Sequence, residues 1–277
     1  MSKKALLIIT SVAIIIASLS ACSLGGADNE VTTIGPATTE TTTIQRTTED
    51  LSTTFAEPDT NYIYPALEKD TSDEFVYELS SYSTHYDSSN TTRTTNIHNA
   101  VDKLDNIVIP SGETFSFNQV VGKRTVLAGY EAAKIVQGDE FVDGLGGGIC
   151  QVSSTIFQAA LRSNLQIKVR ACHSLEISYV PLGGDATVQW NSQDFQFVND
   201  TSSDIKLSVV ASDGTLTCTI KANKDIPVGK VDVEISKDGE QYTLTRKVNG
   251  EVNYTTYSKY SKPKPTTTET TETTKAQ

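Results

Sequence analysis

Hydrophobic spacing divides the chain into two halves with different periods. In the first half, some segments repeat apolar residues every three or four positions, the spacing that covers one face of a helix. Residues 96–104 predict a helix whose apolar face is made of Ile97, Ala100, Val101 and Leu104. Residues 150–162 predict a central helix, with its apolar positions at Val152, Ile156, Ala159 and Ala160. A weaker pattern over residues 124–133 predicts a further helix.

Short apolar or alternating runs indicate strands. The first half has three of them, at residues 107–109, at Phe115 and Phe117, and at residues 166–171. From residue 187 onward the period is two, which is typical of strands. This second half predicts strands at residues 195–198, 205–212, 215–222, 230–235, 241–248 and 252–258. Asp-Gly or Asn-Gly pairs at 213–214, 238–239 and 249–250 are hairpin signals. The sequence therefore predicts an α+β fold, with a helix-presented cysteine on a mixed or antiparallel sheet and an antiparallel β extension after it.

The N-terminal residues predict export. Lys3 and Lys4 precede an apolar run, residues 5–17, that is shorter than the roughly 20 residues of a membrane-spanning helix. The sequence LSAC at residues 19–22 resembles the lipobox of bacterial lipoproteins, in which Cys22 is lipidated. An uncleaved signal anchor is the alternative interpretation. We expect an extracytoplasmic protein, held by lipid on the outer face of the cell membrane.

Composition predicts where the domains begin and end. A tether rich in Thr, Glu, Ser and Pro cannot bury a core, and the C-terminal segment has the same composition. The predicted division is a signal peptide and lipobox (1–22), a disordered tether (23–75), the main domain (76–212), a β-rich extension (213–262) and a disordered tail (263–277).

The acidic charge excludes one class of partner. The chain has 34 Asp and Glu against 23 Lys and Arg, a formal charge of −11. This balance argues against nucleic acid binding, which needs a basic surface. It also argues against a general electrostatic attraction to anionic wall polymers, so we expect any wall contact to occur in a specific cleft.

One of the four cysteines has the surroundings of a nucleophile. With Cys22 assigned to lipid, an odd number remains, which does not suit a disulfide framework. A bond between Cys172 and Cys218 is left open by the sequence. Cys150 follows a glycine run, in GLGGGICQVSST at 144–155, and begins the central predicted helix. The positive end of a helix dipole lowers the pKa of a thiol, so the pattern predicts a reactive thiolate at Cys150.

A nucleophilic cysteine needs a base and a group that orients the base. His173 follows the strand after the central helix, and a returning strand brings its end back toward the start of that helix. We therefore expect His173 to be the base, with a merely packed or surface histidine as the alternative. His85 and His98 are expected to be structural or exposed.

Further residues are assigned roles around this pair. Asp185, after a Gly-Gly turn, is the first choice for orienting the base, and Glu176 and Asp194 are alternatives. Contacts to substrate or to an oxyanion are expected from Gly147, Gly148, Gln151 and Ser153, although Ser153 is equally well explained as a polar residue of a first helical turn.

No metal or cofactor is expected. Cys150, Cys172 and His173 lack the Cys-x-x-Cys or His-x-x-x-His spacing of metal sites. The glycine run lacks the Lys-Ser/Thr pair of a phosphate-binding loop.

Several segments together resemble a known family, the VanW domain of Gram-positive bacteria. The resemblance covers about residues 80–212. The segments that carry it are RTTNI (93–97), PSGETFSFN (110–118), VG (121–122), GY (129–130), the glycine-cysteine segment (144–155), HS (173–174), YVPLGGDAT (179–187) and FVN (197–199).

The resemblance implies an activity, because some members of the family, which is named after vancomycin-resistance clusters, are implicated as L,D-transpeptidases. Cys150 would attack a donor tetrapeptide of peptidoglycan, expel D-alanine and pass the acyl group to an acceptor amine, with His173 moving the proton. The order Cys before His differs from the better-known L,D-transpeptidase domain. The expected partners are peptidoglycan stem peptides and, through the N-terminal lipid, the membrane. The alternatives are a cysteine peptidase or amidase that uses water, and a non-catalytic wall-binding or scaffolding lipoprotein.

Overall fold

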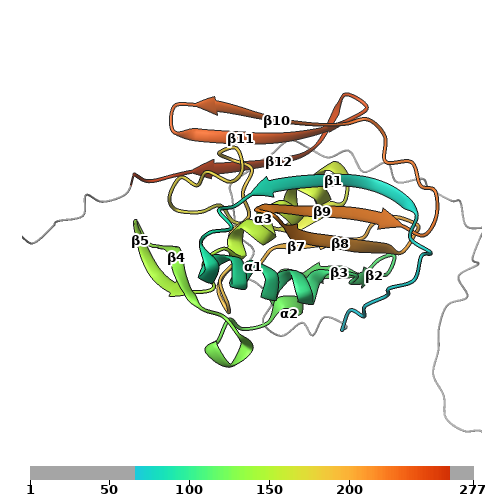
Figure 1. Ribbon diagram of the computed structural model, residues 1–277. Helices are drawn as coiled ribbons and strands as arrows, with labels where there is room; N and C mark the ends of the chain where they lie inside the picture. The colour runs from blue at the N-terminus through green and yellow to red at the C-terminus, as the bar shows by residue number, and fades with distance from the viewer. Residues whose placement is uncertain (1–65, 263–277) are drawn as a thin grey trace, which may run out of the picture. The chain divides into compact units, whose positions relative to one another are not determined.

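The computed structural model describes residues 66–262. The predictions for the signal peptide, Cys22, the tether up to residue 65 and the tail from residue 263 lie outside this range. The helical elements are α1 (Thr91–Leu104), α2 (Phe117–Val121), the 3-10 turn η1 (Val126–Ala128) and α3 (Ile149–Arg162). Figure 1 shows α3 enclosed by strands, which is the predicted α+β class.

Antiparallel sheets build the rest of the domain. The main sheet has the order β1 (Tyr77–His85), β9 (Thr215–Ala222), β8 (Ile205–Ser212) and β2 (Val108–Ile109). A smaller sheet orders β3 (Thr114–Ser116), β7 (Gln196–Val198) and β6 (Gln166–Val169). The C-terminal sheet orders β10 (Val231–Asp238), β11 (Gln241–Val248) and β12 (Glu251–Lys259). A separate hairpin pairs β4 (Ala132–Gln137) with β5 (Glu140–Leu145).

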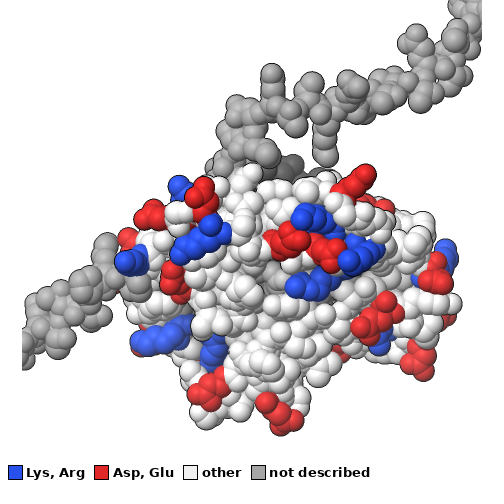
Figure 2. Space-filling model, turned by 90° about the horizontal axis from the view of Figure 1, so that it is seen from above, with Lys and Arg blue, Asp and Glu red and all other residues white. Residues whose placement is uncertain are grey.

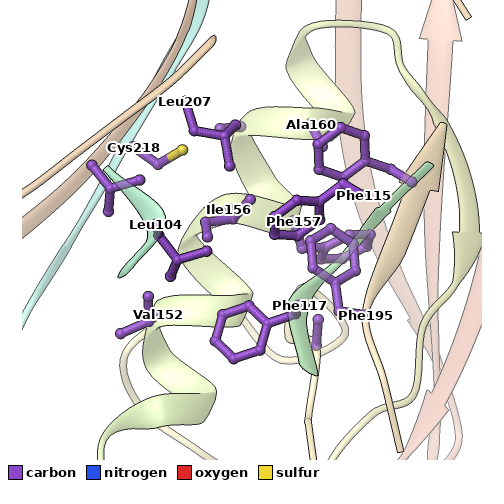
Figure 3. Packing of buried hydrophobic residues seen from close by; sticks show 14 of the residues in the cluster. Leu104, Phe115, Phe117, Val152, Ile156, Phe157, Ala160, Phe195, Leu207 and Cys218 are labelled. Atoms are coloured by element: carbon purple, nitrogen blue, oxygen red, sulfur yellow. The ribbon is translucent and has the colours of Figure 1, made fainter. Parts of the chain in front are cut away.

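Helix α3 is the centre of the core. Almost every residue of its 14 is buried, because sheets and loops cover it on all sides. Figure 3 shows phenylalanines on one side of α3, with Leu104, Leu207 and Cys218 on the other. Phe115 stacks on Phe197 with ring centroids 4.8 Å apart. The rigid position of α3 matters because Cys150 is its second residue.

Helix α1 holds the glycine segment that precedes Cys150. Its predicted apolar face is buried, but the helix begins five residues before the predicted start, where the Asn90 side chain accepts a hydrogen bond from Arg93 N. Asn96, which is also buried, donates to Gly147 O (3.0 Å) and Glu131 O (3.0 Å) and accepts from Glu131 N (2.8 Å). One side chain therefore ties α1 to the chain on both sides of the β4–β5 hairpin.

The helix predicted for residues 124–133 is wrong. That segment contains η1, a left-handed Gly129 (φ 80°) and the start of β4. The apolar residues Val126 and Leu127 would lie on the buried face of such a helix, but both are exposed. Gly138 and Asp139 then form the two-residue hairpin turn between β4 and β5, which was not predicted. Phe117 likewise opens α2 and does not continue a strand.

The strands of the second half follow the predicted pattern. The β8–β9 and β11–β12 hairpins turn at Asp213-Gly214 and Asn249-Gly250, where all four residues have positive φ, as a type I′ turn requires. Strand β9 pairs with β1 as well as β8, so the predicted boundary at residue 212 divides the main sheet. The added sheet consists of β10, β11 and β12.

The N-terminal boundary also lies earlier than predicted. Phe75 is buried, and Lys69 forms a bridge with Ile107, so the last ten residues of the predicted tether pack on the domain.

Within residues 66–262, no helix is long and apolar enough to span a membrane. Figure 2 shows acidic and basic side chains mixed on the face seen from above. Lys247 of β11 and Glu234 of β10 form an ion pair with a separation of 2.7 Å.

Candidate active site

Cys150 lies in the first turn of α3, at the end of the glycine segment. Gly148 caps the helix with φ 109°, a left-handed conformation that glycine adopts without strain. Cys150 is half-buried, and its sulfur atom lies 3.5 Å from Thr187 Oγ1 and 3.5 Å from Val188 O. The helix start and the 187–188 segment therefore fix the thiol from two directions.

His173 is placed between Cys150 and Asp185. Its Nδ1 lies 2.6 Å from Asp185 Oδ2, and its backbone N–H donates to the same oxygen at 2.7 Å. The other ring nitrogen, Nε2, lies 3.3 Å from Tyr179 Oη. The imidazole also hydrogen-bonds the Cys150 thiol, and the residue is only 6% exposed. The structure thus brings together the three residues that the sequence assigned as nucleophile, base and orienting group.

Asp185 is fully buried, and several donors stabilise its charge. Oδ2 accepts from the backbone and ring of His173, while Oδ1 accepts from Arg170 Nη2 (3.0 Å) and Tyr260 Oη (2.6 Å). A buried carboxylate is costly unless it is paired and hydrogen-bonded, and this one has both kinds of partner. Asp185 is therefore held as an anion with one oxygen directed at His173.

The segment around Asp185 is fastened along α3. Gln158 Nε2 donates to Gly184 O (2.5 Å), and Ser154 Oγ accepts from Ala186 N (2.9 Å). A side chain at Gly184 would place its Cβ 2.7 Å from Gln158 Nε2 and 3.0 Å from Pro181 O. The Gly183-Gly184 pair therefore allows the close approach that puts Asp185 beside His173.

The environment shifts the pKa of all three groups. For Asp185, burial raises the pKa but the hydrogen bond with His173 and the charge of Arg170 outweigh it, giving about 2. For His173, burial lowers the pKa, but the Asp185 and Cys150 interactions raise it to about 10. For Cys150, burial raises the pKa, while the hydrogen bond and charge of His173, with Thr187, lower it from 9.0 to about 7. The site favours a thiolate–imidazolium pair near neutral pH.

Two residues assigned to substrate or oxyanion contacts have other roles. Gln151 is buried, and its Nε2 donates to Thr84 Oγ1 (3.0 Å) and His85 O (2.9 Å), so both of its donor hydrogens are used. Ser153 is fully buried and donates to Ala186 O (2.5 Å). Gln151 and Ser153 therefore do not contact substrate or an oxyanion as predicted, because both side chains bind α3 to neighbouring segments of the protein.

The assignment of Gly147 and Gly148 concerns their backbone N–H groups. Among residues 66–262, no acceptor is found for either N–H, although Gly147 O accepts from Asn96. These donors lie one and two residues before the helix that carries Cys150.

The alternative residues are placed away from these roles. Asp194 binds Ser116, Asn118, Phe195 and Gln196, and Glu176 is exposed. His98 is exposed, and His85 contacts Thr215 at the end of β1.

Cys150, Cys172 and Cys218 are all free thiols, so Cys172 and Cys218 are not paired. Within the described residues, no three His, Cys, Asp or Glu side chains are grouped to hold a metal ion.

Sequence reasoning missed four side chains around the site. Tyr179 contacts His173, Tyr260 and Arg170 hold Asp185, and Arg93 donates to Gln151 Oε1 at 2.7 Å. A fifth, Arg124, was placed in a helix that does not form, but its stem packs on Gly146. Arg93 and Tyr179 lie inside segments that carry the family resemblance, which was the available signal. A surface hollow lined by residues such as Lys69 and Lys103 contains none of these groups.

Taken together, these features define an α+β domain that presents a partly exposed cysteine against a buried His–Asp pair. Residues 92–221, just under half of the chain, match the family model described as "VanW like protein", so this segment is a VanW-like domain. The domain therefore accounts for the segment from the second residue of α1 to the penultimate residue of β9, and the three residues at the thiol lie within it.

Two curated relatives support this assignment. The chain is 42% identical over 164 residues to the uncharacterized protein YoaR of Bacillus subtilis (strain 168), covering 59% of this chain and 54% of the relative. It is 28% identical over 134 residues to the vancomycin B-type resistance protein VanW of Enterococcus faecalis (strain ATCC 700802 / V583), covering 47% and 49%. The chain thus spans about half the length of these relatives. No solved structure matches it.

Proposed function

We propose that this protein is a cysteine L,D-transpeptidase that cross-links peptidoglycan stem peptides at the cell surface. The observation that carries the proposal is the contiguous arrangement of Cys150, His173 and Asp185 at the start of α3. The match to the VanW-like family model and the similarity to the vancomycin B-type resistance protein VanW support a role at the cell wall. No cofactor is needed for this chemistry.

Acylation begins with the thiolate. Cys150 Sγ attacks the carbonyl carbon of the L-residue, diaminopimelate or lysine, that precedes the terminal D-alanine, and a C–S bond forms. The N–H groups of Gly147 and Gly148 are available to stabilise the oxyanion. The intermediate collapses as the C–N bond breaks, and the His173 imidazolium gives its proton to the departing amine of D-alanine. A thioester on Cys150 and a neutral His173 remain.

Deacylation reverses the proton movement. The side-chain amine of an acceptor stem attacks the thioester, and His173 Nε2 accepts the proton that this amine loses. The C–S bond then breaks, an amide forms, and the thiolate–imidazolium pair is restored. Asp185 remains an anion throughout, because His173, Arg170 and Tyr260 hold its pKa at about 2. Its bond to Nδ1 leaves Nε2 as the nitrogen that exchanges the proton.

The cellular setting is part of the same proposal. Export and lipidation at Cys22 would place the domain on the outer face of the membrane, where stem peptides occur. The acidic chain would then reach its substrate through the site at Cys150 and not through general charge attraction.

The deciding experiment incubates the full chain, in detergent micelles, with disaccharide-tetrapeptide and follows the products by mass spectrometry. We expect dimers that have lost one D-alanine, and a transient thioester adduct on Cys150. Cys150→Ala should abolish both, while Cys172→Ala, which removes a neighbouring partly exposed thiol, should leave both unchanged.

The other outcomes identify the alternatives. Tripeptides without dimers would show that water is the acceptor and that the protein is a peptidase. Binding of the muropeptide without an adduct or product, and unchanged by Cys150→Ala, would show a non-catalytic wall-binding protein and overturn the proposal.

A further inference from the structure

Two arginine side chains pack directly on the glycine segment that leads into Cys150. Arg93 Cγ lies 3.1 Å from the position a Cβ would take on Gly148, and Arg124 Cγ lies 3.1 Å from that position on Gly146. Both glycines also have positive φ, so they are the residue type that this backbone accepts best. Because glycine has no side chain, these two positions leave room for the arginine stems, which come from two separate segments of the chain.

Both guanidinium groups are held by neutral acceptors. Arg93 Nη2 donates to Gln151 Oε1 (2.7 Å), and Gln151 is itself fixed by Thr84 and His85. Arg124 Nη1 donates to Asn118 Oδ1 (2.7 Å) and Gly122 O (3.0 Å). Each bond positions one nitrogen and leaves other N–H groups of the guanidinium for a ligand.

The positive charges of this pair are not neutralised by a carboxylate contact. None of the ion pairs among residues 66–262 includes Arg93 or Arg124. Asp194 influences Arg124 at longer range, but its oxygens accept from Ser116, Asn118 and their neighbours. The charge that interacts with both arginines is the Cys150 thiolate. Two partly buried cations therefore pack on the glycine segment before the nucleophile and interact with its charge.

We propose that Arg93 and Arg124 form a carboxylate-binding subsite beside Cys150. It selects a donor peptide whose free carboxylate lies one residue beyond the carbonyl that the thiolate attacks. In such a peptide the carboxylate carbon is within about 4 Å of the scissile carbonyl carbon. Guanidinium groups bind carboxylates through paired N–H donors, which fits this role better than a lysine would. The inference rests on the proposed acyl transfer for its substrate, but the subsite itself is testable without turnover.

The first test compares alkylation of Cys150 by iodoacetate and by iodoacetamide in the full chain. Both reagents need the thiolate, so their rate ratio cancels any change in thiol pKa and reports the field acting on the reagent's carboxylate. Arg93→Gln and Arg124→Gln should each lower the iodoacetate-to-iodoacetamide ratio by about tenfold. Arg93→Lys should retain most of the ratio, because it keeps the charge.

Arg162→Gln is the matched control. Arg162 is also partly buried and bonded to a glutamine, Gln158, but it lies at the far end of α3. Its substitution should leave the ratio unchanged. A ratio that is the same in the wild type, Arg93→Gln and Arg124→Gln, in proteins with wild-type circular dichroism, would overturn the subsite.

The second test uses tetrapeptide donors and separates the two sources of a carboxylate. One donor carries a C-terminal carboxamide, and another has its diaminopimelate carboxylate amidated. We expect the terminal carboxamide to reduce acylation of the wild type by about tenfold and to have little effect on Arg93→Gln. If acylation is reduced only by amidation of diaminopimelate, the proposal that the subsite binds the terminal carboxylate is overturned. An arginine-dependent alkylation ratio without any acylation would instead retain the subsite and reject the proposed function.

Discussion

Tyr260 Oη lies 2.6 Å from Asp185 Oδ1, although Tyr260 follows β12 and lies 39 residues beyond the family-matched segment, which ends at residue 221. The same hydroxyl accepts from Gly183 N at 2.6 Å. The C-terminal sheet therefore contributes a hydrogen bond to the anion that orients His173. A domain cut at residue 221 would lack this contact.

Tyr260→Phe tests that relationship. We expect a loss of about 1 kcal/mol in unfolding free energy, because a buried hydrogen bond is removed. The pKa of the Cys150 thiol should also rise, because Asp185 would orient and stabilise the His173 imidazolium less well. The pH dependence of iodoacetamide labelling measures this shift. Tyr242→Phe, which alters the ring packed against Tyr260, is the control and should leave the labelling profile unchanged.

His173 is expected to control the ionisation of Cys150. The wild-type labelling rate should rise through a pKa of about 7. In His173→Ala the profile should move above the ordinary cysteine value of 9.0, because burial would raise the pKa with no imidazolium to oppose it. Acyl transfer should fall by about 10²- to 10⁴-fold with loss of the proton donor. His85→Ala should retain the wild-type profile, and an unshifted His173→Ala profile would contradict the assigned contact.

Acid should remove the stability contributed by Asp185. Its pKa is lowered from 3.8 to about 2, so the contribution is complete above 3.8 and disappears as the pH falls toward 2. The shift corresponds to about 2 kcal/mol. Urea unfolding of wild type and Asp185→Asn across this range measures it. The free-energy difference between them should shrink with acid, and a constant difference would contradict a depressed pKa.

Base should remove a second contribution, from His173. Its pKa is raised from 6.5 to about 10, so the stabilisation is complete below 6.5 and is lost as the pH rises through 10. Urea unfolding of the wild type and of His173→Gln should be measured between these pH values. The two unfolding free energies should converge at high pH. Equal stability differences at both ends of the range would contradict the raised pKa.

Gly147→Ala should displace the segment before Cys150. An added Cβ would lie 2.7 Å from Lys134 O, a backbone atom of β4, so the hairpin must move. We expect a cost of about 1 to 3 kcal/mol and slower labelling of Cys150. Gly138→Ala, in the turn of the same hairpin, meets open space and should cost only about 1 kcal/mol of backbone strain. Labelling should remain at the wild-type rate in that control.

The second-half strands and the two long helices could be predicted because they depend on local signals. Periodicity locates α3 within a residue of its start, and positive-φ dipeptides place the β8–β9 and β11–β12 turns. The helix predicted for residues 124–133 failed because Val126 and Leu127 supply apolar spacing without any partner to cover them. Periodicity reports which residues are apolar, while a neighbouring surface decides whether they are buried.

The sequence by itself determined the chemical types at the site: a cysteine after glycines at a helix start, a later histidine, and an aspartate after a Gly-Gly turn. Tertiary structure decided which polar groups reach them. It directed Gln151 and Ser153 into the core contacts of α3, brought Tyr260 to Asp185 from the added sheet, and packed Arg93 and Arg124 on the glycine segment. The physical reason is that side-chain direction and long-range pairing depend on packing between distant segments, which no local spacing encodes.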